Sequence, residues 1–278
     1  MSNSVPAPGL DRGTAKELAG RLDDARRTRT PTTRLTDDHP GLTEADAYAI
    51  ADHGVALRVA AGERVVGAKM GFTSAAMRQV MGVDSPNYGW LTDPMVVSDG
   101  RVSLGELIHP KAEPEIAFVL GEDLEGAGVS AEDVLSATAY VMPVIEVVDS
   151  RFVDFRFRAL DNTADNSSAG MVVLGSRVTR PAFDLSRVGV VVTVDGELFQ
   201  TSSGAAALGH PAASVAWLVR RLAASGRGLE AGHLIISGGL TGPIDLMPGT
   251  SVFVEMDRLG SASMRVHETR DNKRTLTA

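Results

Sequence analysis

The chain of 278 residues contains no cysteine. This absence excludes disulfides, thiolate metal sites, iron–sulfur clusters and cysteine nucleophiles together. A metal ion in this protein must therefore be held by oxygen or imidazole ligands. With 44% hydrophobic and 22% charged residues, the composition is otherwise typical of a globular protein that can bury a core.

Excess positive charge and long apolar runs are also missing. The net charge is −8 and the isoelectric point about 5.3, which argues against a nucleic-acid surface, because such a surface needs clustered Lys and Arg. An anionic small molecule remains open, since a metal and a few basic groups can reverse the field inside one cleft. No apolar run is long enough to span a bilayer, and Met1–Asp11 lacks the pattern of a leader. We expect a soluble, cytoplasmic protein with neither nucleic acid nor membrane as a partner.

The N-terminal part predicts helices. Residues 14–28 place apolar side chains at helical spacing, with charged residues opposite. Residues 29–40 are polar and rich in turn formers, and we interpret them as a connector. A second helix is predicted from Thr43 to about Ala61, because Thr43 and Asp46 have the spacing of a capping box.

After Gly62 the sequence changes to short apolar segments separated by glycine and proline turns, a pattern typical of β-strands. Asp195-Gly196 has the composition of a tight hairpin turn, and residues 212–224 predict one helix in this part. The predicted strands are Val65–Phe72, Met95–Val97, Glu115–Leu120, Val141–Val148, Met171–Leu174, Val188–Val194, Leu234–Ser237, Ser251–Asp257 and Ser263–His267. We predict an α+β fold with a helical N-terminal region, residues 1–62, and a β-rich domain, residues 63–278.

Two glutamates stand at the mouth of an apolar strand. Glu113 and Glu115 are two residues apart, so both side chains project to the same face of the strand. Like charges that close repel each other, and they are stable there only if they face water, are protonated or bind a cation. A solvated strand entrance is the alternative interpretation of this pair.

A third carboxylate, Glu146, is embedded in the continuous apolar segment 141–148. A buried lone carboxylate is costly, so Glu146 needs a partner, either Arg151 in a structural salt bridge or a metal ion. Carboxylate ligands without thiols suit a hard cation such as Mg²⁺ or Mn²⁺.

Lys69 lies in the middle of an apolar strand between two glycines. Nearby carboxylates would keep its side chain charged, whereas burial near other cations would lower its pKa. It is a candidate for a proton donor, a base or a charge clamp. The alternative is a lysine on an exposed strand face.

Five motifs occur in a fixed order along the chain. They are G-x-K-x-G-x-T-S from residue 67, P-x-x-G from residue 86, P-K-x-E-x-E-I-A-F-V-L from residue 110, P-x-I-E-V-V-D-S-R from residue 143 and A-D-N from residue 164. Together they resemble the family of 2-oxopent-4-enoate hydratases and 2-oxo-3-hexenedioate (4-oxalocrotonate) decarboxylases, within the fumarylacetoacetate hydrolase superfamily. The resemblance covers most of the chain, including residues 208–211 and 235–239.

This resemblance implies a mixed β roll with a smaller helical N-terminal part, in which residues 63–278 are the metal-binding catalytic domain. It implies a Mg²⁺ or Mn²⁺ ion held by Glu113, Glu115 and Glu146, with Lys69 as the catalytic residue near a small 2-oxo acid. It also implies a homo-oligomer, and it leaves room for a complex with a partner enzyme of the same pathway.

In such enzymes the metal chelates the 1-carboxylate and the 2-oxo oxygen and stabilises a dienolate. Residues 149–157 and 164–168 and the run Gly209-His210-Pro211 resemble the decarboxylase version, and Asn87 stands where many hydratases carry Asp. The expected activity is therefore Mg²⁺-dependent decarboxylation of 2-oxo-3-hexenedioate to 2-hydroxypenta-2,4-dienoate in aromatic meta-cleavage catabolism. The alternatives are a 2-oxopent-4-enoate-type hydratase, an acylpyruvate hydrolase and an inactive metal-stabilised binding protein.

Three further residues are candidates for binding substrate. Arg151 can bind a carboxylate or pair with Asp149, and Ser167 can donate a hydrogen bond to substrate or shape a turn. Lys111 can bind an anionic substrate or remain solvated at the end of its strand.

Overall fold

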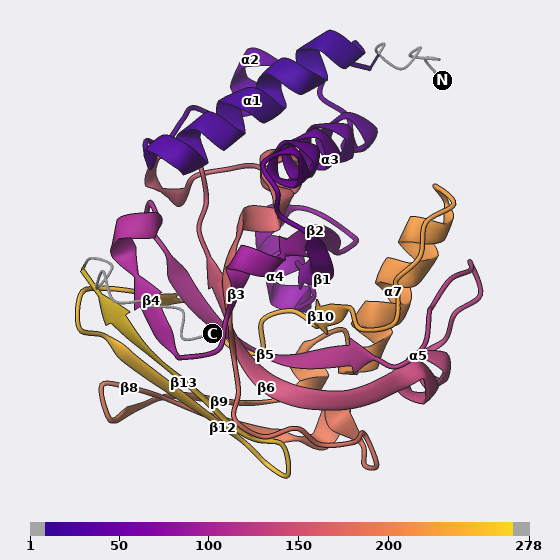
Figure 1. Ribbon diagram of the computed structural model, residues 1–278, viewed down its shortest axis with the longest axis vertical. Helices are drawn as coiled ribbons and strands as arrows, with labels where there is room; N and C mark the ends of the chain where they lie inside the picture. The colour runs from indigo at the N-terminus through magenta and orange to yellow at the C-terminus, as the bar shows by residue number, and fades with distance from the viewer. Residues whose placement is uncertain (1–8, 269–278) are drawn as a thin grey trace.

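Two β-sheets pack together beneath a layer of helices in the computed structural model, which describes residues 9–268 (Figure 1). The helices are α1 (Arg12–Thr28), α2 (Leu35–Asp38), α3 (Glu44–Ala60), α4 (Ala75–Met81), α5 (Ala131–Ala137), α6 (Ala159–Ala164) and α7 (Pro211–Ala223). The strands are β1 (Val65–Gly71), β2 (Asn87–Thr92), β3 (Val96–Val97), β4 (Arg101–Ser103), β5 (Lys111–Leu120), β6 (Thr138–Val148), β7 (Ala169–Leu174), β8 (Gly189–Val194), β9 (Glu197–Ser203), β10 (Leu234–Ile236), β11 (Ile244–Asp245), β12 (Ser251–Met256) and β13 (Gly260–His267). The predicted α+β fold is confirmed.

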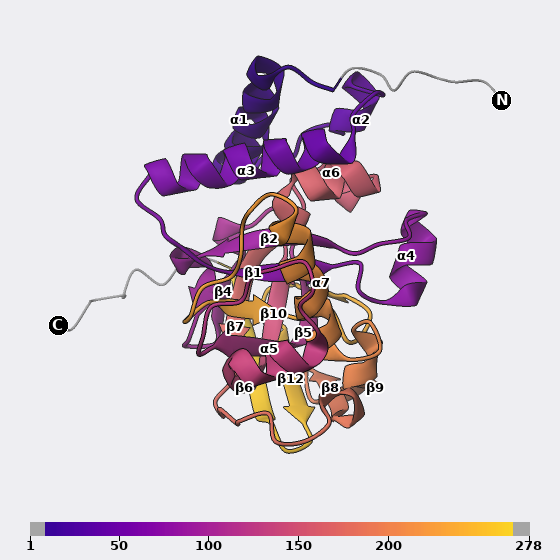
Figure 2. The ribbon, with the colours of Figure 1, turned by 90° about the vertical axis from the view of Figure 1, so that its right-hand side faces the viewer.

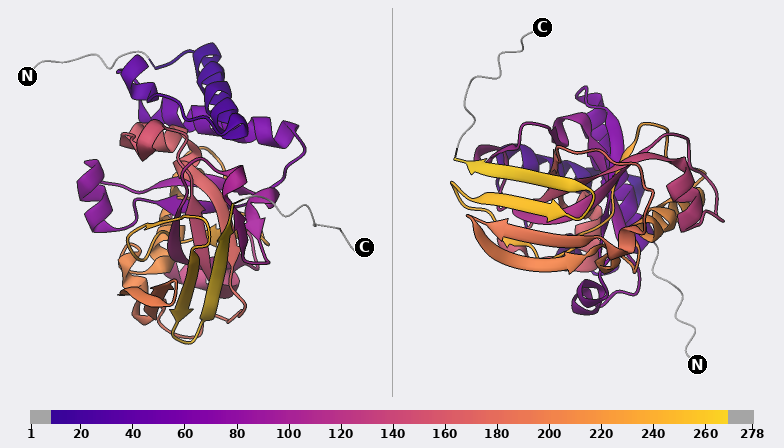
Figure 3. Two further views of the ribbon diagram at one scale, coloured as in Figure 1. Left: turned by 90° about the vertical axis from the view of Figure 1, so that its left-hand side faces the viewer. Right: turned by 90° about the horizontal axis from the view of Figure 1, so that it is seen from below.

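The larger sheet has the strand order β2-β1-β10-β5-β6-β7-β3, with β11 added to β5. The smaller sheet has the order β4-β13-β12-β8-β9, and the right-hand view of Figure 3 shows its yellow and orange strands, β13, β12, β8 and β9, side by side. Strands β5 and β6 are the longest pair, and they hold buried side chains on both faces, such as Phe118 on one face and Val144 on the other. Each such side chain contributes about 1.5–3 kcal/mol by its removal from water. Packing on both faces therefore holds the centre of the larger sheet in place.

The N-terminal helices α1 and α3 lie across the end of the larger sheet, beside α6 (Figure 2). The helices predicted at 14–28 and from Thr43 are confirmed, and α3 begins with the expected capping box. Their apolar faces share one buried cluster with Phe152 and Ala164, residues from the β-rich part of the chain. The boundary at residue 62 stays a prediction.

The predicted strands are all present, with ends that shift by a few residues. The Asp195-Gly196 turn joins β8 to β9, and both residues have positive φ, 52° and 87°, as a type I′ hairpin turn requires. The structure adds α2 inside the expected connector, and α4, α5, α6, β2, β4, β9 and β11 elsewhere. No helix between residues 9 and 268 combines the length and the apolar character that a bilayer crossing needs.

Asp46 supplies a test of how the N-terminal helices are held. Its carboxylate accepts hydrogen bonds from the backbone of Thr43 (2.9 Å) and Leu10 (2.9 Å) and from the Thr43 hydroxyl (2.6 Å). We expect Asp46→Ala to lower the free energy of unfolding by about 1–2 kcal/mol, the cost of losing such a cap, as measured by urea denaturation. Asp24→Ala is the control, because Asp24 makes only an exposed ion pair with Arg27; an equal loss in both variants would contradict the capping role.

Candidate metal and substrate site

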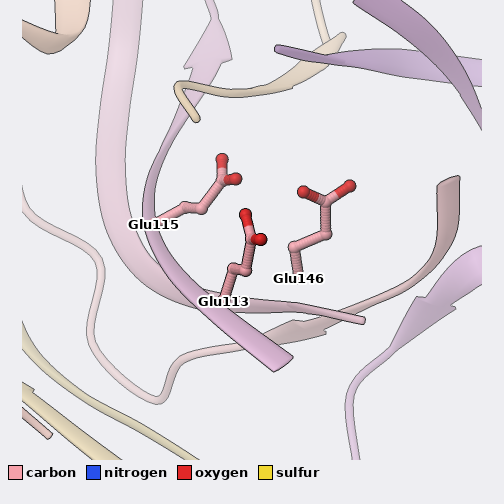
Figure 4. Close-up of side chains that lie close together, drawn as sticks. All are labelled: Glu113, Glu115 and Glu146. Carbon is pink, nitrogen blue, oxygen red and sulfur yellow. The ribbon is translucent and has the colours of Figure 1, made fainter. Parts of the chain in front are cut away.

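Glu113, Glu115 and Glu146 converge from the two central strands. Glu113 and Glu146 are directly opposite partners in the β5–β6 ladder, and Glu115 follows Glu113 on the same face. Each residue offers one carboxylate oxygen, and these three oxygens lie within 4.8 Å of one another. Figure 4 shows the three side chains gathered around one point. The sequence prediction that these carboxylates meet is therefore confirmed.

The surroundings leave two of the three carboxylates short of hydrogen-bond partners. Glu115 and Glu146 are fully buried, and Glu113 is half-buried. Oε2 of Glu115 accepts a hydrogen bond from the Gly238 amide (2.6 Å), whereas Oε1 of Glu115 and both oxygens of Glu146 have no hydrogen-bond partner. Unpaired buried oxygens of this kind are costly, and a bound cation would satisfy them.

The pKa values of the three carboxyl groups also favour a bound cation at this site. Burial, and then the charge of Glu146, raises the pKa of Glu113 to about 7. The same two causes raise the pKa of Glu115 well above its usual value, and burial raises that of Glu146. A divalent cation would reverse this by stabilising the ionised forms. The oxygen-only donor set fits a hard ion such as Mg²⁺.

Two glycines explain how the loop after β10 approaches the carboxylates. A Cβ on Gly239 would lie 2.5 Å from Oε2 of Glu113, and a Cβ on Gly238 would lie 2.0 Å from Oγ1 of Thr73. Gly238 also has a φ of +104°, which an L side chain rarely adopts. Only glycine therefore lets the Gly238 amide reach Glu115.

Lys69 on β1 is buried beside the three carboxylates. Its Nζ lies 3.1 Å from Oε1 of Glu146, and it donates hydrogen bonds to the carbonyl oxygen (2.9 Å) and the hydroxyl oxygen (3.2 Å) of Ser167. The Lys69 ammonium therefore donates two hydrogen bonds to Ser167 and forms an ion pair with Glu146. The alternative interpretation of Lys69, a lysine on an exposed strand face, is therefore wrong.

Ser167 is held in a backbone conformation that costs energy. Asn166, Ser167 and Ser168 have φ of 51°, 52° and 54°, and each such residue costs about 1–2 kcal/mol relative to ordinary backbone. The side chain of Asn166 compensates by exchanging two hydrogen bonds with the backbone of Trp90 (2.7 and 2.9 Å). The strained turn presents both Ser167 oxygens to Lys69, so the strain has a positioning role.

Asn87 holds this turn from the other side, and the sequence did not reveal that role. Its Nδ2 donates to Asn162 (2.8 Å) and Thr163 (3.0 Å), so its Oδ1 must be the atom that accepts from the Ser167 hydroxyl (3.0 Å). Since that hydroxyl donates to Asn87, its oxygen is free to accept from Lys69. Gly71 lies against both side chains, because a Cβ there would be 2.1 Å from Oδ1 of Asn87.

A cavity of about 240 Å³ opens in front of Lys69 and Glu113. Its walls are largely apolar and come from distant parts of the chain; they include Met70, Phe72, Met77, Met81, Val148, Phe155 and Phe157. Asn162, Ser167 and Ser168 add polar groups, and Lys111 is a further cation among the lining residues. A small molecule with an anionic end and an apolar middle fits these surroundings.

Of the three predicted substrate-binding residues, the structure brings Lys111 and Ser167 to this cavity and leaves Arg151 outside it. Arg151 is buried, forms an ion pair with Asp165 and donates to the carbonyl oxygen of Ala169 (3.0 Å). The Asp149 side chain accepts from the amides of Ile108 (3.0 Å) and His109 (2.9 Å), whereas Arg151 donates to the backbone carbonyl oxygen of Asp149 (2.5 Å). Arg151 therefore supports the strained turn from behind, and a direct contact with substrate finds no support in its position.

Comparison with known proteins decides the family. The family model described as fumarylacetoacetate (FAA) hydrolase C-terminal matches residues 68–267. The chain belongs to this family. The resemblance inferred from the five motifs is thereby confirmed, and the matched region includes Lys69 and all three glutamates.

Curated relatives cover nearly the whole chain. A 2-hydroxyhexa-2,4-dienoate hydratase of Comamonas testosteroni is 42% identical over 89% of this chain and 96% of that protein. A 4-oxalocrotonate decarboxylase of Pseudomonas sp. (strain CF600) is 40% identical over 92% of this chain and 98% of that protein. Decarboxylases and hydratases are both lyases, and this family member is a lyase.

Solved structures also include a close structural relative from this family. The 4-oxalocrotonate decarboxylase of Pseudomonas putida G7, complexed with magnesium and adipate, is 39% identical, covers 92% of this chain and 98% of that chain, and superposes with a TM-score of 0.90. A fumarylpyruvate hydrolase of Pseudomonas aeruginosa shares the fold only, with 18% identity and a TM-score of 0.56.

Glu115→Gln and Glu146→Gln test the metal site. We expect Mg²⁺ to raise the melting temperature of the chelator-treated wild type, since saturation at a hundredfold excess over Kd stabilises a protein by about 2.7 kcal/mol. Both variants should fold but lose this rise, as measured by differential scanning fluorimetry with and without chelator. Glu197→Gln, at an exposed position on β9, is the control; a normal Mg²⁺ response in either site variant would contradict the assignment.

Asn87→Ala tests the positioning of Lys69 through Ser167. Because small misplacements of reacting groups can cost up to about 100-fold in rate, we expect kcat to fall by about 10- to 100-fold, with KM and the Mg²⁺ response nearly unchanged. Thr163→Val removes another partner of Asn87 without touching Ser167 and should change kcat by less than about threefold. Steady-state kinetics of both variants measures these changes. Equal losses of kcat in the two variants would show that Asn87 has a structural role only.

Proposed function

We propose that this protein catalyses the Mg²⁺-dependent decarboxylation of 2-oxo-3-hexenedioate to 2-hydroxypenta-2,4-dienoate, in aromatic meta-cleavage catabolism. The observation that carries the proposal is the buried carboxylate site with Lys69, which faces a cavity with largely apolar walls. The relative that was solved with magnesium and adipate adds support, because adipate is a six-carbon dicarboxylate like the proposed substrate. Mn²⁺ is a second ion with the same ligand preference.

The residues divide the work between the two ends of the substrate. Glu113, Glu115 and Glu146 would hold Mg²⁺, which supplies a Lewis acid for negative charge on the 1-carboxylate and the 2-oxo oxygen. Lys69, held by Ser167 and Glu146, adds a positive charge and a proton donor next to that oxygen.

The apolar walls act on the other end. As the bond between C5 and C6 breaks, its electron pair passes through C4 and C3 to the 2-oxo oxygen, and C6 leaves as CO₂. Phe155, Phe157 and Met77 line the cavity and exclude water. An apolar environment favours the change from a charged carboxylate to neutral CO₂.

Hydration of a 2-hydroxy-2,4-dienoate is the second candidate. The 42% identity to a dienoate hydratase favours it, and Asn162, Ser168 and Lys69 provide polar groups on one side of the cavity that can hold a water molecule. The two activities share the carboxylate site and Lys69. They differ in whether C6 leaves or water adds.

Assembly and location extend the proposal. We propose a homo-oligomer, and the exposed apolar side chains Leu198, Phe199 and Phe253 on the smaller sheet support it. We also propose a complex with a partner enzyme that consumes the dienoate product. The cytoplasmic location stays a prediction.

Turnover of 2-oxo-3-hexenedioate tests the proposal. We expect CO₂ release and the ultraviolet absorbance of the dienol product in the presence of Mg²⁺, and neither after chelation. Lys69→Met should reduce kcat by about 10²- to 10⁴-fold, the usual contribution of a positioned proton donor, while its Mg²⁺ response remains. Mg²⁺-dependent consumption of 2-hydroxypenta-2,4-dienoate without CO₂ release from the hexenedioate would move the assignment to hydratase.

A further inference from the structure

Two lysines line the substrate cavity, and they differ in how freely their ammonium groups can bind a ligand. Lys69 lies inside, and its donors are engaged with Ser167 and Glu146. Lys111 also lines the cavity, and its ammonium contacts Asp245 and the ring of Phe155. Among the lining residues that the structure describes, these two are the cations. An anionic group of a ligand that extends away from the carboxylate site therefore has Lys111 as its available partner.

Strand β5 fixes the distance between this cation and the metal ligands. Lys111 and Glu113 are two residues apart and both line the cavity, so they share one face of the strand. Two residues of strand advance by about 6.6 Å. The terminal carbons of an extended six-carbon diacid are separated by five bonds of about 1.5 Å each, or roughly 6 Å along the zigzag. The backbone positions of Lys111 and Glu113 are thus about as far apart as the two ends of such a diacid, and their side chains enter the cavity from one face of the strand.

The partner that Lys111 has in the structure is easily exchanged. Asp245 is the cross-strand neighbour of Lys111 in the β11–β5 pair, and its side chain is 79% exposed. Exposed ion pairs contribute little to stability, so a ligand carboxylate can replace Asp245 at little cost. The Phe155 ring, whose centroid is 5.4 Å from Nζ of Lys111, keeps the ammonium at the cavity during the exchange.

We propose that Lys111 binds the distal carboxylate of the substrate by exchanging Asp245 for it, and that this contact makes the site selective for six-carbon dicarboxylates over monocarboxylates. The proposal rests on the proposed function for the other end of the substrate, which the carboxylate site binds. It assigns Lys111 to substrate recognition and excludes it from the bond-breaking step.

The chemistry of decarboxylation gives this contact a specific kinetic signature. The distal carboxylate loses its charge as CO₂ departs, so Lys111 interacts with the ground state at least as strongly as with the transition state. An interaction of that kind lowers KM without raising kcat. Removal of the Lys111 charge should therefore raise KM and leave kcat nearly unchanged.

Lys111→Met tests the contact, because it keeps the apolar stem and removes the charge. In the Mg²⁺-loaded enzyme we expect KM for 2-oxo-3-hexenedioate to rise about tenfold or more, with kcat within about threefold of wild type. Asp245→Asn is the matched control; it frees Lys111 and should leave KM unchanged or lower it. A fall in kcat at constant KM, or no change in either constant, would overturn the proposal.

Ligand binding separates this proposal from the proposed function. In the presence of Mg²⁺, adipate should raise the melting temperature of the wild type more than the four-carbon succinate or the monocarboxylate valerate does. Lys111→Met should lose this preference and keep the shift caused by Mg²⁺ alone. This result would support Lys111 even if the hexenedioate were not turned over. Absence of an adipate preference in the wild type, or its persistence in Lys111→Met, would refute the role of Lys111.

Discussion

Repulsion among three clustered carboxylates is the constraint on which the site depends. Glu113, Glu115 and Glu146 bring oxygens within 4.8 Å of one another. Burial raises the pKa of each, and the charge of Glu146 raises the pKa values of Glu113 and Glu115 further. Lys69 supplies one positive charge, which cannot balance three negative ones. A divalent cation completes the balance, and its open coordination positions would face the cavity in which a 2-oxo acid fits.

The fold tolerates this charge because the surrounding structure is stiff. The glutamates are on β5 and β6, the longest paired strands of the sheet, where packing leaves little room for them to move apart. The turn that holds Lys69 is strained at Asn166, Ser167 and Ser168. Asn87 fixes it by a hydrogen bond from Ser167, and Arg151 fixes it by a hydrogen bond to Ala169. The strain is therefore stored where the ammonium has to be placed, and it is offset by hydrogen bonds from elements far apart in sequence.

The carboxylate site could be predicted from the sequence because local rules determine it. The period of two in a strand places Glu113 and Glu115 on one face, and a Glu inside an apolar strand needs a partner. The register that sets Glu146 opposite Glu113 is a property of the pairing between strands, and no local pattern reveals it. The motif order supplied what local patterns could not.

The missed features have physical reasons of their own. Helix α4 has no buried residue and β9 is mostly exposed, so neither carries an apolar periodicity. Asn87 looks like a turn residue in sequence, and its partners Asn162 and Ser167 lie 75 and 80 residues away. Arg151 was expected to meet substrate, Glu146 or Asp149; its ion pair is with Asp165, and it meets Asp149 at the backbone carbonyl oxygen.

Anomalous diffraction from crystals grown with Mn²⁺ in place of Mg²⁺ tests the central claim most directly, because it locates the ion without relying on activity. The account predicts one strong peak at about 2 Å from oxygens of Glu113, Glu115 and Glu146, with Lys69 beside it and an open side toward the cavity. A peak held by other residues, or an ordered site without any peak at saturating Mn²⁺, would contradict it.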